Sequence, residues 1–146
     1  MYAVALRMLA HNAADAEDVV QEAWLRAVGG LHRFRGESAL GTWLVGIAVR
    51  CALEACRRRR SDVESIATAA QRPSRVDALD LERTIAALAE GYRHVLVLHD
   101  IHGYTHAEIG ALLGIDEGTS KSQLSRARHI VRQALAPTEL SEESTK

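Results

Sequence analysis

The hydrophobic positions of this chain recur at helical spacing over most of its length. Between Asp15 and Val28, apolar residues stand at positions 16, 19, 20, 23, 24, 27 and 28, which is the spacing of one helix face. Asp15 is the expected N-cap of this helix. A second helix is predicted from Ser38 to about Arg60, where apolar residues again form one stripe. That stripe consists of Leu40, Trp43, Leu44, Ile47, Cys51 and Ala55.

The same spacing returns from residue 81 to residue 136. Thr105 and Glu108 have the spacing of a capping box, which predicts the start of a short helix. Gly114 is the expected end of that helix, and Asp116 is the expected N-cap of the next one. The polar side of this next helix consists of Lys121, Ser122, Ser125, Arg126 and His129. A capped helix, a tight turn and a basic helix together predict a helix-turn-helix.

The segments between and after these helical stretches have a different character. Residues 62–80 have weaker periodicity and contain Pro73, which predicts a linker that is partly helical at its far end. Residues 137–146 are acidic and polar, as is typical of a disordered tail. We therefore expect an all-α fold of two small helical domains, residues 1–61 and residues 81–136, with the helix-turn-helix in the second.

Composition narrows the class of protein. Aromatic residues make up only 4% of the 146 residues, so the core must consist mainly of aliphatic side chains, which favours helices. The net charge of −1 argues against a uniformly basic surface but allows local basic patches. Cys51 and Cys56 lack the spacing of a disulfide framework, and we expect them to be reduced thiols in a cytoplasmic protein. No apolar run approaches the roughly 20 residues of a membrane span, so no membrane insertion is expected.

Two features are unusual for the helices of a soluble protein: a leucine on a polar helix side and a run of arginines at a helix end. Leu25 stands among Asp18, Gln21 and Glu22 on the polar side of its helix. Single exposed leucines are common, but an apolar centre with an acidic rim is also typical of a docking face. The second helix ends in four consecutive arginines, Arg57 to Arg60. Cations suit a helix C-terminus and such a run is often only a solvated end, although four arginines exceed what capping requires.

A cluster of histidines raises an alternative function. His99, His102 and His106 lie close together in the sequence, as they would in a metal sensor or enzyme. Gly103 breaks the helix between them, and no carboxylate or cysteine accompanies them at ligand spacing. We therefore expect satisfied or exposed histidines, no metal site and no cofactor. A nucleophile–base set, a phosphate loop and paired carboxylates are also missing from the sequence, so no catalytic residue is predicted.

Two separated segments resemble one family. "DAEDVVQEAWLRAV" followed by "LHRFRGESALGTWLVGIAV" is similar to the second conserved region of the extracytoplasmic-function sigma factors of bacterial RNA polymerase. "YRHVLVLHDIHGYTHAEIGALLGIDEGTSKSQLSRAR" is similar to their fourth region. The resemblance implies that the chain binds core RNA polymerase and directs promoter recognition and transcription initiation, with an anti-sigma factor as a further partner.

The resemblance also implies roles for particular residues. The face that docks on polymerase would consist of Asp18, Gln21, Glu22 and Leu25. The part that melts and binds the downstream promoter element would include Phe34, Arg35, Trp43, Arg50 and Arg57. The upstream element would be read in the major groove by Lys121, Ser122, Gln123, Ser125 and Arg126, with His99 and Thr105 beside them.

The chain departs from the family pattern at several positions. Arg50 stands where the family usually has Asn, Ser120 where it has Val, and Gln123 where it has Arg. The promoter sequence that the family usually recognises is therefore not assigned to this chain. Met1 matches the middle of the family's first helix, which implies a missing upstream segment or a misassigned start. An alternative function is a sigma-like helix-turn-helix regulator that no longer docks on polymerase. A plain helical interaction protein would leave the basic run unexplained.

Overall fold

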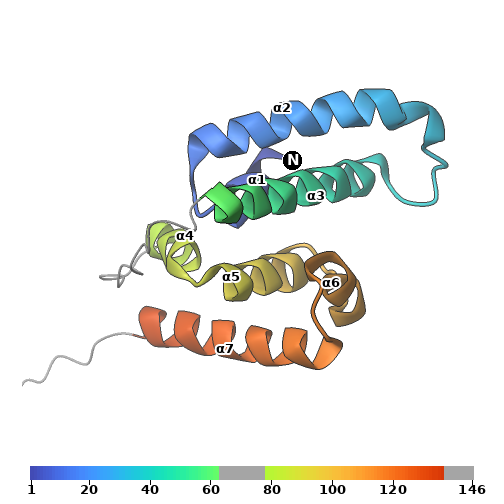
Figure 1. The fold of residues 1–146 in the computed structure, drawn as a ribbon. Helices are drawn as coiled ribbons and strands as arrows, with labels where there is room; N and C mark the ends of the chain where they lie inside the picture. Colours follow the sequence, from blue (N-terminus) through green and yellow to red (C-terminus); the bar gives the residue numbers. More distant parts are fainter. Residues whose placement is uncertain (63–77, 137–146) are drawn as a thin grey trace, which may run out of the picture.

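The computed structural model describes residues 1–62 and 78–136, and every element in these ranges is helical (Figure 1). In chain order they are α1 Tyr2–Met8, α2 Ala13–Gly30, the 3-10 turn η1 Leu31–Arg33, α3 Leu40–Asp62, α4 Ala78–Ala87, α5 Glu90–Leu96, the π-helical turn η2 Val97–Ile101, α6 His106–Leu113 and α7 Glu117–Leu135. The predicted all-α fold is confirmed. Most of the predicted linker, 63–77, and the predicted tail, 137–146, lie outside the described residues.

The first half of the molecule is built from α1, α2 and α3, which pack against one another (Figure 1). Small side chains dominate the contact, which lets the helix backbones approach closely. The buried residues that α2 and α3 contribute include Ala16, Val19, Ala23, Ala48, Val49 and Ala52. This agrees with the aliphatic core that the composition predicts.

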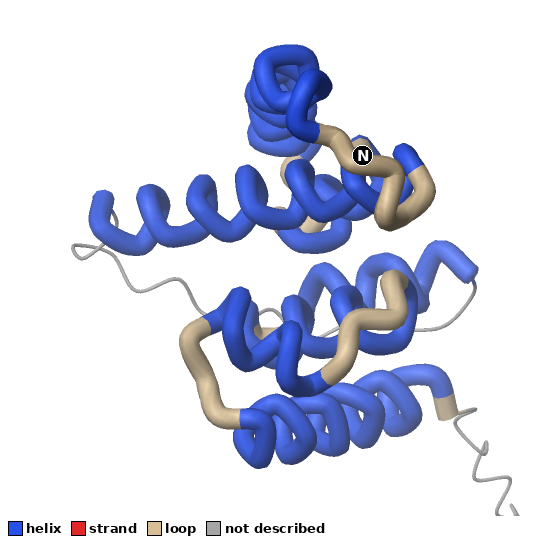
Figure 2. The backbone as a smooth tube through the Cα atoms, turned by 90° about the vertical axis from the view of Figure 1, so that its right-hand side faces the viewer, coloured by secondary structure: helices blue, strands red, loops and turns tan. Residues whose placement is uncertain are grey.

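The second half consists of α4, α5, η2, α6 and α7. Helix α7 packs on α5, α6 and α4, and Figures 1 and 2 show it on the side that faces away from α2. Val97 and Leu98 of η2, Ile109 of α6, and Leu124 and Ala127 of α7 all belong to the buried core. The inner side of α7 therefore packs against the other helices of the second half, and its outer side is exposed to solvent.

The two halves share one continuous core. Helix α1 packs on α4 and α5 as well as on α2 and α3. The side chain of Arg93 in α5 crosses this boundary, and its Nε donates to the carbonyl of Met8 at 3.2 Å. Its Nη1 donates to the carbonyls of Ala86 and Leu88, at 3.1 and 2.8 Å. A buried arginine held by three carbonyls therefore ties α5 to the ends of α1 and α4.

Some sequence predictions about helix α2 are wrong. The N-cap is Asn12, not Asp15, and the side chain of Asn12 accepts a hydrogen bond from the Asp15 N–H at 3.1 Å. Trp24 and Val28, predicted on the buried stripe, are 52% and 72% exposed. Helix α1 has seven residues and α2 has 18, or about 10 Å against about 27 Å at 1.5 Å per residue. Because α1 is too short to cover the second part of α2, only its alanines are buried there.

Helix α3 also differs from its prediction. It begins at Leu40, two residues after the predicted start, and continues to Asp62. Leu40, placed on the core stripe by its spacing, is 46% exposed. The buried face instead lies further along, where α1 and α2 both contact the helix: it comprises Ala48, Val49, Cys51, Ala52, Leu53 and Cys56. Both cysteines are free and buried, as expected.

Candidate nucleic-acid interface

The start of α6 is held by a reciprocal cap. The hydroxyl oxygen of Thr105 accepts a hydrogen bond from the Glu108 N–H at 3.2 Å, and the Glu108 carboxylate accepts one from the Thr105 N–H at 2.7 Å. The bond from the Thr105 N–H lowers the pKa of Glu108, as does a second bond that the Thr105 hydroxyl donates to the same carboxylate at 3.0 Å. Gly114 ends the helix in the left-handed conformation with φ of 68°. The predicted capping box and helix end are both confirmed.

The turn between α6 and α7 is close-packed. A Cβ atom at Gly110 would lie 2.7 Å from the carbonyl oxygen of Ile115, far inside normal contact. The N–H groups of Gly114 and Ile115 both donate to the Gly110 carbonyl, at 2.9 and 3.1 Å. Asp116 occupies the N-cap position of α7 as predicted, but its side chain makes no capping hydrogen bond. Backbone contacts at Gly110 therefore set the angle between the two helices.

The outer side of α7 is exposed and cationic. Lys121, Ser122, Ser125 and Arg126 are exposed, while Leu124 on the opposite side is buried. Lys121 pairs with Glu117 at 2.9 Å, one turn earlier. Among the described residues, Arg126 has no ion-pair or hydrogen-bond partner. A slim helix surface with one free guanidinium suits a groove lined by phosphates and base edges.

Gln123 takes a different position from the other predicted groove-reading residues. Its side chain is half-buried, and a Cβ at Gly91 of α5 would lie 3.5 Å from the Gln123 amide. The Oε1 atom of Gln123 is buried without a hydrogen-bond partner. The structure thus places Gln123 against α5, beneath the exposed side of α7.

The histidines beside this helix pair make separate contacts. The rings of His99 and His106 stack, with centroids 4.6 Å apart and 20° between planes. His99 Nδ1 lies 2.8 Å from Asp100 Oδ1, and His106 Nδ1 lies 2.9 Å from the hydroxyl of buried Ser120. Burial is the main cause that lowers the pKa of His106 and that of His102. The buried Ser120 hydroxyl thus holds the His106 ring from the side of α7.

The predicted downstream-element residues lie at one end and along one side of α3. Phe34 and Trp43 are in contact, with ring centroids 5.3 Å apart and a tilt of 49°. Trp43, Arg50 and Arg57 follow at intervals of seven residues, which places them on the same helix side. Arg50 is exposed, whereas Arg57 donates a hydrogen bond to the Leu112 carbonyl at 3.0 Å. Arg35 is exposed in the loop before α3.

Helix α2 presents an apolar patch to solvent. Leu25 is 76% exposed, as predicted from its place on the polar side. The patch is larger than the sequence indicated, because it also includes Trp24 and Val28 and the neighbouring Leu31 of η1. We call these four residues the α2 patch. Their exposure could have been predicted only with knowledge of how far α1 extends.

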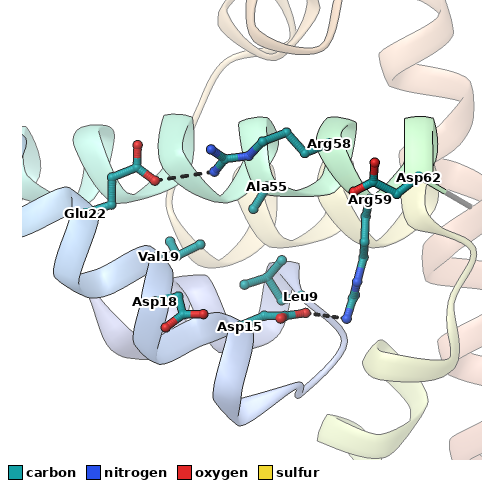
Figure 3. Close-up of a pocket in the computed structure, with 9 residues that line it drawn as sticks. All are labelled: Leu9, Asp15, Asp18, Val19, Glu22, Ala55, Arg58, Arg59 and Asp62. Atoms are coloured by element: carbon teal, nitrogen blue, oxygen red, sulfur yellow. Dashed lines mark hydrogen bonds and ion pairs between the residues drawn. The ribbon is translucent and has the colours of Figure 1, made fainter.

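The acidic residues next to the α2 patch belong to a network with α3 (Figure 3). Glu22 pairs with Arg58 at 3.3 Å and with Arg26 at 2.5 Å. Arg59 pairs with Asp15. A hollow of about 300 Å³ between α2 and α3 is lined in part by Asp15, Asp18, Glu22, Arg58 and Arg59. Two arginines of the basic run are thereby engaged with α2, and Asp18 and Gln21 remain exposed.

The helices in the described ranges include none with the length and hydropathy that a membrane crossing would need.

Both halves of the chain match known protein families. Residues 1–62 match the family model described as Sigma-70 region 2, and residues 78–129 match Sigma-70, region 4. The chain is 33% identical over 127 residues to the ECF RNA polymerase sigma factor SigM of Mycobacterium tuberculosis, covering 84% of this chain and 65% of SigM. It is 36% identical over 143 residues to the ECF RNA polymerase sigma-E factor of Escherichia coli, covering 84% and 75%.

A solved structure extends the comparison to the fold. The sigma factor RpoE from Bartonella quintana, in complex with the anti-sigma factor NepR, superimposes with a TM-score of 0.66 and 26% identity. The match covers 91% of this chain and 88% of that chain. The present chain thus spans 65% of the length of SigM and most of the solved RpoE. With two sigma-70 regions matched in order and one relative covered over three quarters of its length, the chain belongs to the extracytoplasmic-function family of RNA polymerase sigma factors.

Proposed function

We propose that this chain is a transcription initiation factor, which binds core RNA polymerase through α2 and directs it to promoter DNA. The observation that carries this proposal is the α2 patch. Its four large apolar side chains have no partner among the described residues, although they lie beside an acidic rim. Such patches on soluble proteins mark protein–protein contacts. A regulator that binds DNA alone would have no use for it.

We infer that α7 reads the upstream promoter element in the major groove. The first turns of a recognition helix usually make the base contacts, and Lys121, Ser122 and Ser125 lie there with Arg126. Thr105, at the exposed N-terminus of α6, is placed to meet a phosphate. His99 is the neighbouring candidate for a phosphate contact. Gln123 would act by positioning α7 on α5, since its side chain is half-buried.

We infer that the loop before α3 and one side of α3 bind the melted downstream element. Phe34 and Trp43 offer aromatic surfaces on which an unpaired base can stack. Arg35 and Arg50 supply positive charge for the adjacent phosphates. Arg57 is exposed on the same side and uses one guanidinium N–H for the Leu112 carbonyl, so its other donors can reach a phosphate.

This proposal divides the chain into parts. Residues 1–61 would bind polymerase and melt DNA, 62–80 would link, 81–136 would recognise the upstream element, and 137–146 would form a tail. The chain itself would perform no chemistry, which is left to the polymerase. One related structure, RpoE, is in complex with the anti-sigma factor NepR, and another, CnrH, is in complex with the cytosolic domain of CnrY. We infer that this chain also has an anti-sigma partner.

The test uses core RNA polymerase purified from the bacterium that encodes the chain, free of other sigma factors. We expect a stable complex in gel filtration, and melting of selected genomic upstream fragments detected by permanganate reactivity. DNA binding by a folded chain that forms no complex with core polymerase would support the alternative, a sigma-like regulator. Repeating the assay with an extended N-terminus would show whether upstream residues restore docking.

A further inference from the structure

A second group of polar side chains lies apart from the DNA and polymerase surfaces, where the two halves pack together. Cys56 comes from α3, and Glu90 and His94 come from α5. Each offers one metal-binding atom, and these atoms lie within 4.8 Å of one another. Cys56 and His94 are buried, while Glu90 is partly exposed. We propose that this Cys56–Glu90–His94 cluster binds a divalent metal ion of the zinc class and bridges the two halves.

The spacing of the ligand atoms fits zinc. The Cys56 Sγ and His94 Nε2 atoms are 3.8 Å apart. Tetrahedral coordination at normal zinc bond lengths, about 2.3 Å to sulfur and 2.0 Å to nitrogen, places such atoms about 3.5 Å apart. Glu90 and His94 are one helical turn apart on α5, so both face α3 from the same side. Water would complete the tetrahedron, entering on the partly exposed side of Glu90.

The Nε2 atom of His94 has a second polar neighbour besides Cys56. In the structure Nε2 also lies 3.2 Å from the carbonyl of Met8. That carbonyl keeps a donor when the metal takes Nε2, because Arg93 Nε also donates to it at 3.2 Å. The tautomer with its proton on Nδ1 then presents Nε2 to the ion.

The surrounding charges allow a dication at this point. A thiolate and a carboxylate together neutralise the ion, and the Cys56 proton leaves to solvent as the sulfur–metal bond forms. Arg60 forms an ion pair with Glu90 Oε1 at 2.5 Å, and this buried oxygen accepts no hydrogen bond from the described residues. The Arg60 side chain is 65% exposed and can turn into solvent. Arg59 pairs with Asp15, and Arg93 directs its guanidinium to backbone carbonyls.

A metal at this position joins α3 of the first half to α5 of the second. It would hold the halves in the packed arrangement, whether or not polymerase or DNA is bound. Neither Cys56 nor His94 was among the candidate ligands in the sequence, because the two residues are 38 positions apart. Their proximity arises from the packing of the two halves.

The experiment is a titration of the reduced, chelator-treated full-length chain with Co²⁺, which reports sulfur ligands through an intense near-ultraviolet charge-transfer band. We expect one equivalent to bind, with the band present, and Zn²⁺ to displace it. Cys56→Ser and His94→Gln should lose the band, and Glu90→Gln should weaken binding at least about tenfold, since even outer-shell partners contribute that much. Cys51→Ser is the matched control, a buried cysteine of the same helix outside the cluster, and should keep the band.

The Glu90→Gln variant keeps the test decisive if a buried substitution unfolds the chain, because Glu90 is partly exposed. No band in the folded wild-type chain would overturn the metal site, as would a band that Cys51→Ser loses and Cys56→Ser keeps. The bridging role has its own readout: Zn²⁺ should slow amide hydrogen exchange in α5 of the wild type but not of His94→Gln. Bound Co²⁺ with unchanged exchange on adding Zn²⁺ would overturn the bridge.

Discussion

Arg7 of α1 and Glu82 of α4 form an ion pair that joins the two halves across 75 positions of sequence. Arg7 Nη2 and Nε donate to Glu82 Oε1 at 2.9 and 3.1 Å, and Nε also lies 3.3 Å from Oε2. The His11 ring adds a contact to Oε2 at 3.0 Å. The Glu82 carboxylate of the second half is thus bound by two side chains of the first half, Arg7 and His11.

A double-mutant cycle with Arg7→Gln and Glu82→Gln should measure this link. We expect a coupling free energy of about 0.5 to 1 kcal/mol in urea unfolding, because both side chains are about 30% exposed and exposed pairs contribute little. The exposed Lys121–Glu117 pair within α7 is the matched control, for which a smaller coupling is expected. Zero coupling between Arg7 and Glu82 would show that the halves are held by apolar packing alone.

The same pair should make part of the stability depend on pH. Hydrogen bonds from Arg7, and to a lesser extent the contact with His11, lower the pKa of Glu82 below 4.5 in the folded chain. A lowered carboxyl pKa stabilises the fold above the unfolded pKa, and this contribution is lost as pH falls through the folded value. The destabilisation caused by Arg7→Gln should therefore be full at pH 7 and shrink in acid. Urea midpoints of both proteins at stepwise lower pH test this; a difference that is independent of pH would contradict it.

Two glycines of the helix-turn-helix should respond in opposite ways to alanine. At Gly110 the new Cβ would meet the Ile115 carbonyl at 2.7 Å, and backbone cannot move aside as a side chain can. We expect Gly110→Ala to destabilise the fold by roughly 1 to 3 kcal/mol. At Gly118, in the first turn of α7, nothing lies within 4 Å, so Gly118→Ala should stabilise by up to about 1 kcal/mol. Equal effects in thermal unfolding would mean that the turn is not close-packed.

The helix-turn-helix was predictable from the sequence because its signals are local. Thr105 and Glu108 cap α6 within one turn, and Gly114 ends it by its own conformation. The α2 patch was only partly predictable. Leu25 is out of register with the apolar stripe and could be identified as exposed, whereas Trp24 and Val28 are in register. Their exposure depends on the length of α1, a property of a different segment.

Contacts between the halves could not be read from periodicity at all. The hydrophobic spacing of α3 and α5 shows which side of each helix is apolar, but not which residues of the two helices lie opposite each other. Cys56 facing His94, and Arg57 reaching Leu112, both depend on that relative placement. Gln123 is similar, because its spacing on α7 does not reveal that its amide lies next to Gly91 of α5.

If the α2 patch docks on polymerase, Leu25→Ser should weaken the complex without unfolding the chain. Its side chain is 76% exposed, so we expect stability to change by less than about 0.5 kcal/mol. An anchor at the centre of a protein interface contributes about 2 kcal/mol or more, or roughly 30-fold in the dissociation constant. Leu81→Ser, at a partly exposed leucine of α4, is the control and should bind core polymerase normally. Equal losses in both variants would point to a general effect on folding.

Arg126 should contribute to recognition of the upstream element through base edges. It is exposed and unpaired among the described residues, whereas Lys121 is already paired with Glu117. We expect Arg126→Ala to weaken binding of the holoenzyme to its cognate promoter by about 1 to 3 kcal/mol, with little change on a scrambled upstream element.

The matched control is Arg132, in the last turns of α7, whose Nε donates to the Arg128 carbonyl. Arg132→Ala should have a small effect on both DNAs, because base contacts come from the start of a recognition helix. Equal losses for Arg126→Ala on cognate and scrambled DNA, with a shallower salt dependence, would instead make Arg126 a phosphate contact.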